Sequence, residues 1–113
     1  VYRYADILMM KGEALVRQGH PELAVPLFNE VRSRTGLPDY TASDLTLDEI
    51  YDERGREFAW EGLRRQDMIR FGKWCEPRDL KPNESPEYTK LYPIPTNIRK
   101  TNVNLKQNSG YPD

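Results

Sequence analysis

The sequence has 113 residues, of which 37% are hydrophobic and 31% are charged, enough for one small soluble domain with a modest core. With 17 basic and 18 acidic residues the formal net charge is -1, which gives no electrostatic basis for binding nucleic acid. The single cysteine, Cys75, excludes an internal disulfide, and the single histidine, His20, leaves a histidine-based metal site or catalytic triad without partners. We therefore expect no metal and no cofactor.

The first residues of the sequence bear on whether it is part of a longer protein. It opens with Val1, without an initiator methionine, and a helical pattern is already under way. No signal peptide is visible, and no apolar run approaches the roughly 18 residues that a membrane-spanning helix needs. We expect the chain to be a C-terminal fragment of a longer protein, whose targeting signals would lie upstream.

Residues 1–36 have the pattern of a helical hairpin. Apolar residues recur at three- and four-residue spacing over residues 1–18, which predicts a first helix. Pro21 then stands where a first helical residue belongs, and a second apolar face runs toward Gly36. Gly12 predicts a close helix crossing, because glycine in mid-helix costs about 1 kcal/mol relative to alanine. The pair resembles one tetratricopeptide-type unit, which cannot bury its own face alone.

Residues 46–72 predict two further helices. Thr46 and Glu49 form a capping box, in which the hydroxyl accepts from the Glu49 amide and the carboxylate reaches back. We expect the helix that opens there to run until Gly62 breaks it. A shorter helix should follow over residues 64–71.

Charged side chains fall on the apolar face of these two helices. Glu57 and Glu61 are one helical turn apart, so a continuous helix would put both carboxylates on one face. A glycosidase could use such a pair as acid and base. Neighbouring arginines, however, favour ionised carboxylates, whereas a general acid must hold a proton. We therefore predict no catalytic residue, and a structural ion-pair network formed by Arg54, Glu57, Glu61, Arg64, Asp67 and Arg70.

Residues 73–113 lose all helical periodicity and contain most of the prolines. Each proline pushes its predecessor out of the α region, so long helices are excluded. A structureless tail of this length needs a reason. We expect it to cover the helices, anchored by Tyr92, Ile94, Leu105 and Tyr111.

Three aromatic residues are possible sugar-stacking platforms, because an aromatic ring matches the apolar C–H face of a pyranose. Trp60 lies inside an expected helix beside Phe58, so we expect it in the core. Trp74 follows a helix end and Tyr88 lies in a loop, so these two are the candidate ligand-binding residues, with packing in the core or against the tail as the alternative that we favour. The rest of a ligand site is unknown.

Four blocks, at residues 3–15, 31–38, 53–72 and 92–111, carry a family resemblance. The third block is the most distinctive, with Glu57-Phe58-Ala59-Trp60-Glu61-Gly62 at its centre. In this order and spacing the blocks resemble the C-terminal part of the SusD/RagB family, the surface nutrient-binding lipoproteins of Bacteroidota.

The resemblance implies a mainly α, non-enzymatic protein with tetratricopeptide-like hairpins. From the length of the chain we expect residues 1–113 to form a single domain. It also implies an N-terminal lipid on a cysteine absent from this chain, as the only means of membrane association, and a position on the outer membrane surface. The implied partners are a SusC-like TonB-dependent transporter and the glycans or other nutrients passed to it. A tetratricopeptide-type protein–protein adaptor is the alternative, although such an adaptor needs no long tail.

Overall fold

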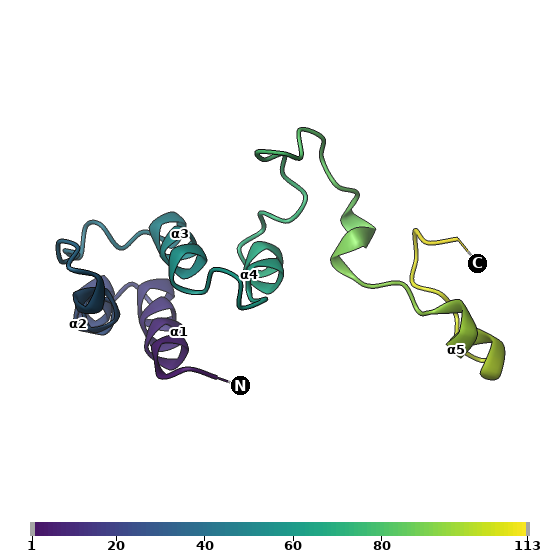
Figure 1. The fold of residues 1–113 in the computed structure, drawn as a ribbon, viewed down its shortest axis with the longest axis horizontal. Coiled ribbons are helices and arrows are strands. Elements are labelled where there is room, and N and C mark those ends of the chain that lie inside the picture. Colours follow the sequence, from purple (N-terminus) through teal and green to yellow (C-terminus); the bar gives the residue numbers. More distant parts are fainter. Residues whose placement is uncertain (1, 113) are drawn as a thin grey trace. The chain divides into compact units, whose positions relative to one another are not determined.

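A computed structural model describes residues 2–112 of the chain, and its helices are connected by loops (Figure 1). The helices are α1 (Tyr4–Arg17), α2 (Pro21–Arg32), α3 (Leu47–Glu57), α4 (Arg64–Arg70) and α5 (Thr96–Thr101), with short 3-10 turns at Ser33–Thr35 and Glu87–Lys90. The described residues contain no β-strand, only one isolated bridge between Arg78 and Lys81. The mainly α prediction is confirmed.

The chain divides into two compact units, Val1–Arg64 and Arg65–Asp113. Each unit is described by itself below. The prediction of a single domain over residues 1–113 stays a prediction, as does the expectation that the tail covers the hairpin.

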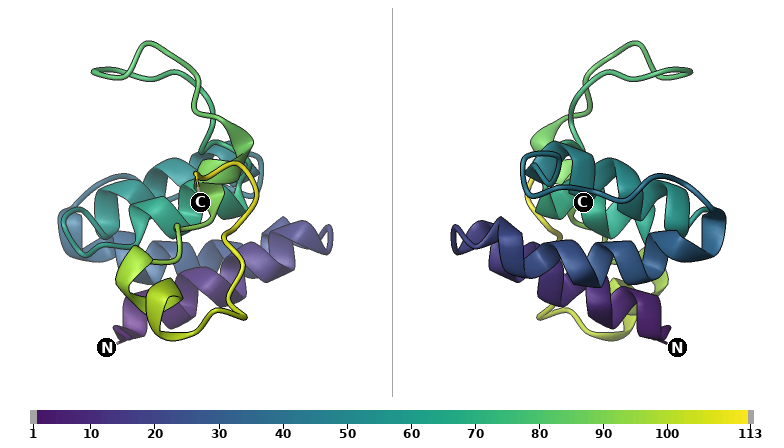
Figure 2. Two further views of the ribbon diagram at one scale, coloured as in Figure 1. Left: turned by 90° about the vertical axis from the view of Figure 1, so that its right-hand side faces the viewer. Right: turned by 90° about the vertical axis from the view of Figure 1, so that its left-hand side faces the viewer.

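The first unit is built on the predicted hairpin. Helix α1 packs along α2, with α3 against α1, and Figure 2 shows α1 in purple and α2 in blue lengthwise. Only Gln18, Gly19 and His20 connect the first two helices, and Gly19 supplies the positive φ of 84° that reverses the chain. Apolar side chains from all three helices and the loop before α3 fill the core: Leu8, Met9, Ala24, Phe28, Val31, Tyr40, Leu45 and Ile50.

Gly12 lies at the contact between the two hairpin helices. A Cβ added there would be only 2.4 Å from Cε2 of Phe28. The Phe28 ring, which is 1% exposed, therefore occupies the space that any larger residue would need. The predicted close crossing is confirmed, and its partner is the largest fully buried side chain of the described residues.

Thr46 caps helix α3 as predicted, because its hydroxyl accepts a hydrogen bond from the Glu49 amide at 3.1 Å. The flanking residues Leu45 and Ile50 are both buried, as expected of a hydrophobic staple. The other half of the capping box is replaced. The Thr46 amide donates to the Asp44 carbonyl, and the Glu49 carboxylate is bound by Tyr40 and Arg56.

Two expectations for the end of α3 are wrong. The helix ends at Glu57, so Glu61 lies in the following turn and the two carboxylates do not share one helix face. Trp60 is not in the core but is fully exposed, with a positive φ of 67°. The physical reason lies in the backbone of Phe58, whose φ of -106° and ψ of 26° are no longer helical, so that the residues after it turn away from the helix axis.

The second unit has little regular structure. Helix α4 is the predicted short helix, and it buries Asp67 and Met68. Beyond it the chain is held mostly by side chains that hydrogen-bond to backbone groups: Gln107 with both the amide and the carbonyl of Ile94, Asn108 with the Tyr92 carbonyl, and Tyr111 with the Leu91 carbonyl. In residues 2–112, no helix combines the length and apolar character required to cross a bilayer.

Candidate functional site

Helix α3 carries Arg54 and Glu57, two members of the predicted ion-pair network. At its centre the Arg54 guanidinium donates to the Asp6 carboxylate of α1 at 3.0 Å, and both side chains are at most 6% exposed. Burying two charges is unfavourable unless they pair and their remaining hydrogen bonds are made. This ion pair therefore fixes how α3 lies on α1.

The end of α3 is held by arginines from other parts of the chain. Arg3 donates to Glu57 at 2.9 Å and to Glu61 at 2.9 Å, so one guanidinium binds both carboxylates. Arg34 binds Glu57 as well, at 2.6 Å. The Glu57 side chain is only 8% exposed and accepts hydrogen bonds from two guanidinium groups. It therefore links the end of α3 to Arg3 and Arg34.

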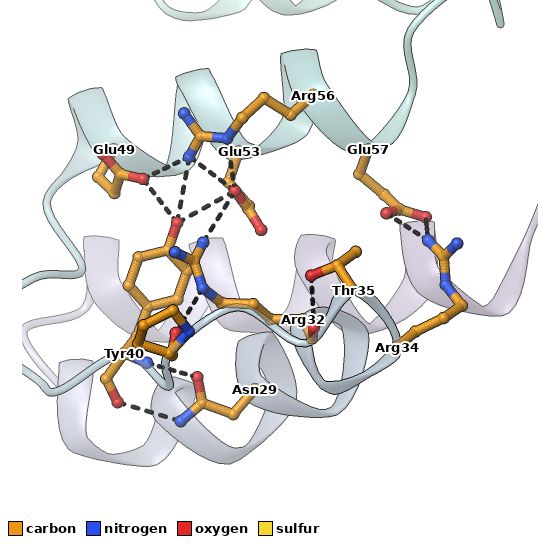
Figure 3. Close-up of polar contacts among 10 residues, drawn as sticks. Asn29, Arg32, Arg34, Thr35, Tyr40, Glu49, Glu53, Arg56 and Glu57 are labelled. Carbon is orange, nitrogen blue, oxygen red and sulfur yellow. Dashed lines mark hydrogen bonds and ion pairs between the residues drawn. The ribbon is translucent and has the colours of Figure 1, made fainter.

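Figure 3 shows a second polar group, the Tyr40 cluster, formed by Arg32, Tyr40, Glu49, Glu53 and Arg56. The Tyr40 hydroxyl donates to Glu49 at 2.6 Å and lies 3.1 Å from Glu53. Arg56 donates to Glu53 at 2.7 Å and also binds Glu49. The Arg32 guanidinium lies 4.0 Å from the centre of the Tyr40 ring and donates to Glu53 at 3.2 Å.

A double hydrogen bond fixes the loop that carries Tyr40. The Asn29 side chain of α2 accepts from the Tyr40 amide at 2.8 Å and donates to the Tyr40 carbonyl at 3.0 Å (Figure 3). The loop between α2 and α3 is therefore held to both helices. The backbone of Tyr40 binds Asn29 of α2, and the Tyr40 hydroxyl binds the glutamates of α3.

The environment of the Tyr40 cluster changes the pKa of its groups. Burial of Tyr40, together with its hydrogen bond to Glu49, raises the pKa of the phenol above 10.0. Burial alone would raise the pKa of Glu49, but hydrogen bonds from Tyr40 and Arg56 outweigh it and hold the pKa below 4.5. The phenol thus stays protonated and the carboxylate charged, which suits a fixed structural cluster and not proton transfer.

The remaining charges predicted for the network lie in two places. Arg64 stacks on the Tyr51 ring at 3.6 Å, donates to the Tyr51 carbonyl at 2.7 Å and lies 3.9 Å from Asp52. In the second unit, Arg70 binds Asp67 at 2.9 Å. Of the six predicted residues, these last two pair with each other, whereas Arg54, Glu57 and Glu61 are bound by residues near the N-terminus of the chain, Asp6 and Arg3.

Trp74 and Tyr88, the candidate ligand-binding residues, are both in the second unit. The Trp74 indole donates to the Thr89 hydroxyl at 2.9 Å, and the Arg65 guanidinium lies 4.6 Å from its ring centre. Tyr88 is 39% exposed and stacks edge-on against Tyr111 at 4.8 Å. Both rings thus make internal contacts, and their assignment as ligand contacts stays a prediction.

Sequence reasoning missed the partners that come from far along the chain, Asp6, Arg3 and Arg34. One signal could have found Asp6, because a carboxylate in the first turn of a mostly apolar helix needs a counter-charge. No group of side chains in the described residues has the composition of a metal site. The clusters on α3 can orient helices, but they offer neither a nucleophile nor a proton donor for catalysis.

The charged face of α3, set among distant arginines, coincides with the most distinctive block of the sequence. The model of the SusD family matches residues 1–111. The chain belongs to the SusD family. The match covers the hairpin, both following helices and the irregular tail.

Curated SusD-family relatives are similar over almost the whole chain. The starch-binding protein SusD of Bacteroides thetaiotaomicron is 33% identical, over 98% of this chain and 21% of its own length. SusD-like protein P25 of Formosa agariphila is 33% identical, over 98% of this chain and 24% of its own length. The chain thus spans no more than about a quarter of the length of these relatives.

Solved structures of the family have the same fold. Surface glycan-binding protein A from Bacteroides thetaiotaomicron, at 32% identity, has a TM-score of 0.81 over 96% of this chain and 24% of its own. The same protein in complex with laminarihexaose has a TM-score of 0.78 over the same shares of the two chains. A SusD superfamily protein from Parabacteroides distasonis, at 30% identity, has a TM-score of 0.81 over 98% of this chain and 27% of its own. Surface glycan-binding protein A and the starch-binding protein SusD are named as binding proteins and not as enzymes, which supports the expectation of a non-enzyme.

Proposed function

We propose that this chain is the helical scaffold of a cell-surface lipoprotein that binds glycans or other nutrients. The whole protein would deliver them to a SusC-like TonB-dependent transporter in the outer membrane. An N-terminal lipid outside this chain would hold it there.

The single observation that carries the proposal is the match to the SusD family over residues 1–111, which includes the tail. A tetratricopeptide adaptor would share only the hairpin, so the match beyond residue 36 favours the binding lipoprotein. The structure with laminarihexaose supports a saccharide as ligand, since that relative superposes on this chain with a TM-score of 0.78. The ion pairs of α3 support a scaffold role, because they join helices and occupy the carboxylates.

The test is glycan binding by the protein purified in its full encoded length. It is titrated calorimetrically with maltohexaose and laminarihexaose and screened on an array of other oligosaccharides. We expect saturable binding to at least one class of glycan. Peptide binding without affinity for any glycan or other nutrient would contradict the proposal and favour the adaptor.

The transporter is tested separately. The tagged full-length protein is isolated from detergent-solubilised outer membranes, with an unrelated tagged surface lipoprotein as the matched control. We expect a SusC-like transporter to co-purify with the first protein only. Co-purification with neither, or with both equally, would contradict the delivery role while leaving glycan binding intact.

A further inference from the structure

Trp60 is the most unusual residue of the first unit. Its side chain is fully exposed, and its φ of 67° lies in the left-handed region that bulky residues rarely adopt. Gly62, two residues on, also has a positive φ, of 79°. Both torsions lie in the short turn between α3 and α4, and this turn leaves the indole of Trp60 in solvent. Such an outlier is a reason to look for a ligand.

A hollow of about 670 Å³ lies beside this tryptophan. It is open to solvent, which suits an extended ligand lying across the surface more than a small molecule enclosed by the protein. Its walls combine an aromatic ring, a carboxylate and guanidinium groups, contributed by Asp52, Arg56, Phe58, Trp60 and Arg64.

The polar wall of the hollow is fixed in place. Arg64 is held by the ring and the carbonyl of Tyr51, at 3.6 Å and 2.7 Å. It can lie there because residue 55 is glycine: a Cβ at Gly55 would be 2.6 Å from the Arg64 Nη1 atom. A glycine inside a helix is otherwise unfavourable. Gly55 therefore makes room for a positioned hydrogen-bond donor.

The geometry points to an accessory binding surface for a neutral oligosaccharide, centred on Trp60. The indole face would stack on the apolar C–H face of one pyranose. Arg64 would donate to sugar hydroxyls and Asp52 would accept from them, which fixes orientation as a few polar groups do in ligand sites. This inference rests on the proposed function and deepens it by naming where one saccharide binds.

The charges on the rim favour a neutral ligand. Asp52 is 57% exposed, so its carboxylate would repel an acidic sugar or a phosphate. Arg64 already donates to a backbone carbonyl and lies near Asp52, and Arg56 is neutralised by Glu49 and Glu53, which reduces the attraction of both arginines for an anion. Hydroxyl groups, which both donate and accept, match this mixture of donors and acceptors.

Hydroxyl-radical footprinting with mass spectrometry tests the surface on the protein in its full encoded length. The probes are laminarihexaose and maltohexaose. We expect Trp60 to be oxidised readily in the free protein and protected at least twofold by one of the probes, in a dose-dependent way. Leu80 is the internal control, because it is as exposed as Trp60 and also has a positive φ, of 63°. Its oxidation should not change.

Two substitutions complete the test. Trp60→Ala should weaken the affinity for the protecting saccharide by roughly five- to tenfold, as truncating a central aromatic anchor does. Leu80→Ala should not change it. Binding elsewhere without protection of Trp60 would overturn this inference and keep the proposed function. Low oxidation of Trp60 in the free protein would overturn it too, because another part of the protein would then cover the ring. No binding of any glycan would overturn both.

Discussion

The two units of the chain are stabilised in different ways. In the first unit, charged side chains reach across long sequence separations: Arg54 to Asp6 and Arg3 to Glu57 join α3 to the start of the chain. In the second, buried apolar residues are scarce, the buried carboxylate of Asp67 pairs with Arg70 only three residues away, and other side chains bind backbone groups of neighbouring loops. Arg65 is typical, because it donates to the carbonyls of Thr89 and Lys90.

The difference shows what an arginine does in each setting. Between helices it neutralises a buried carboxylate, and removing it leaves a charge without water or a partner. Between loops it satisfies carbonyl groups and stacks on rings, as Arg65 does at 4.0 Å from the Tyr92 ring centre and 4.6 Å from that of Trp74. Loss of the first kind should lower the free energy of global unfolding, whereas loss of the second should loosen the structure only locally.

The largest effect is expected from Arg54→Met. It leaves Asp6 buried without its guanidinium and should lower the free energy of unfolding by about 3–5 kcal/mol, measured by urea denaturation. Replacing Asp6 by leucine in the same protein should restore part of that loss, because no buried charge remains. A double variant no more stable than Arg54→Met would contradict this account.

An ion pair of the second unit is the control. Lys90 binds Glu87, whose side chain is 76% exposed. Lys90→Met should leave the urea midpoint unchanged within error, because exposed ion pairs are screened by water. A loss equal to that of Arg54→Met would remove the distinction between the two units.

A backbone position gives the next largest effect. Gly12→Ala should destabilise the protein by about 1–3 kcal/mol, because the new methyl group would collide with the buried Phe28 ring. In an open helix the same change would stabilise. Gly55→Ala is the matched control, because its Cβ would displace only the end of the half-exposed Arg64 side chain from Tyr51 and would not meet a buried ring. That variant should be close to the wild type in a thermal melt.

The second unit is tested with Arg65→Ala. The variant loses two hydrogen bonds to carbonyls and should lower the free energy of local opening by about 1–2 kcal/mol. Hydrogen exchange at the amides of Thr89 and Leu91, which are bonded within that turn, should become faster. The first unit should keep its exchange rates. Arg78→Ala, which removes a more distant contact with the Trp74 ring, should have little effect.

The smallest expected effect is a change in the free energy of unfolding with pH. The pKa of Tyr40 is raised above 10.0 in the folded protein, so its contribution is complete below pH 10.0 and is lost as the pH rises toward the raised pKa. The free energy of unfolding should therefore fall between about pH 10 and about pH 12, and Tyr40→Phe should make this fall shallower. Tyr2→Phe, at a tyrosine that is 78% exposed, should keep the wild-type slope in the same denaturation series.

The features of the fold that depend on a few neighbouring residues could be predicted from the sequence. The Thr46 cap, the reversal at Gly19 and the close approach at Gly12 all follow from a single residue and its neighbours. The family resemblance rested on four short blocks in order, and the match over residues 1–111 confirms it.

The end of α3 could not be predicted in this way. Helical spacing continues past Glu57, but the backbone leaves the helical region at Phe58, and the Glu61 carboxylate pairs with Arg3. Arg3 is 58 residues from Glu61 in sequence, so no local pattern signals the contact. The same turn exposes Trp60, which is why a residue predicted for the core became the centre of a proposed site.

The Arg54–Asp6 ion pair also bears on how the protein folds. It closes a loop of 48 residues, whereas the hairpin of α1 and α2 closes over a three-residue connection. Short loops close faster and at lower entropic cost, so the hairpin should form before α3 docks. In stopped-flow experiments Gly12→Ala should slow refolding, and Arg54→Met should mainly speed unfolding. Equal effects of both variants on refolding would show that α3 docks in the rate-limiting step.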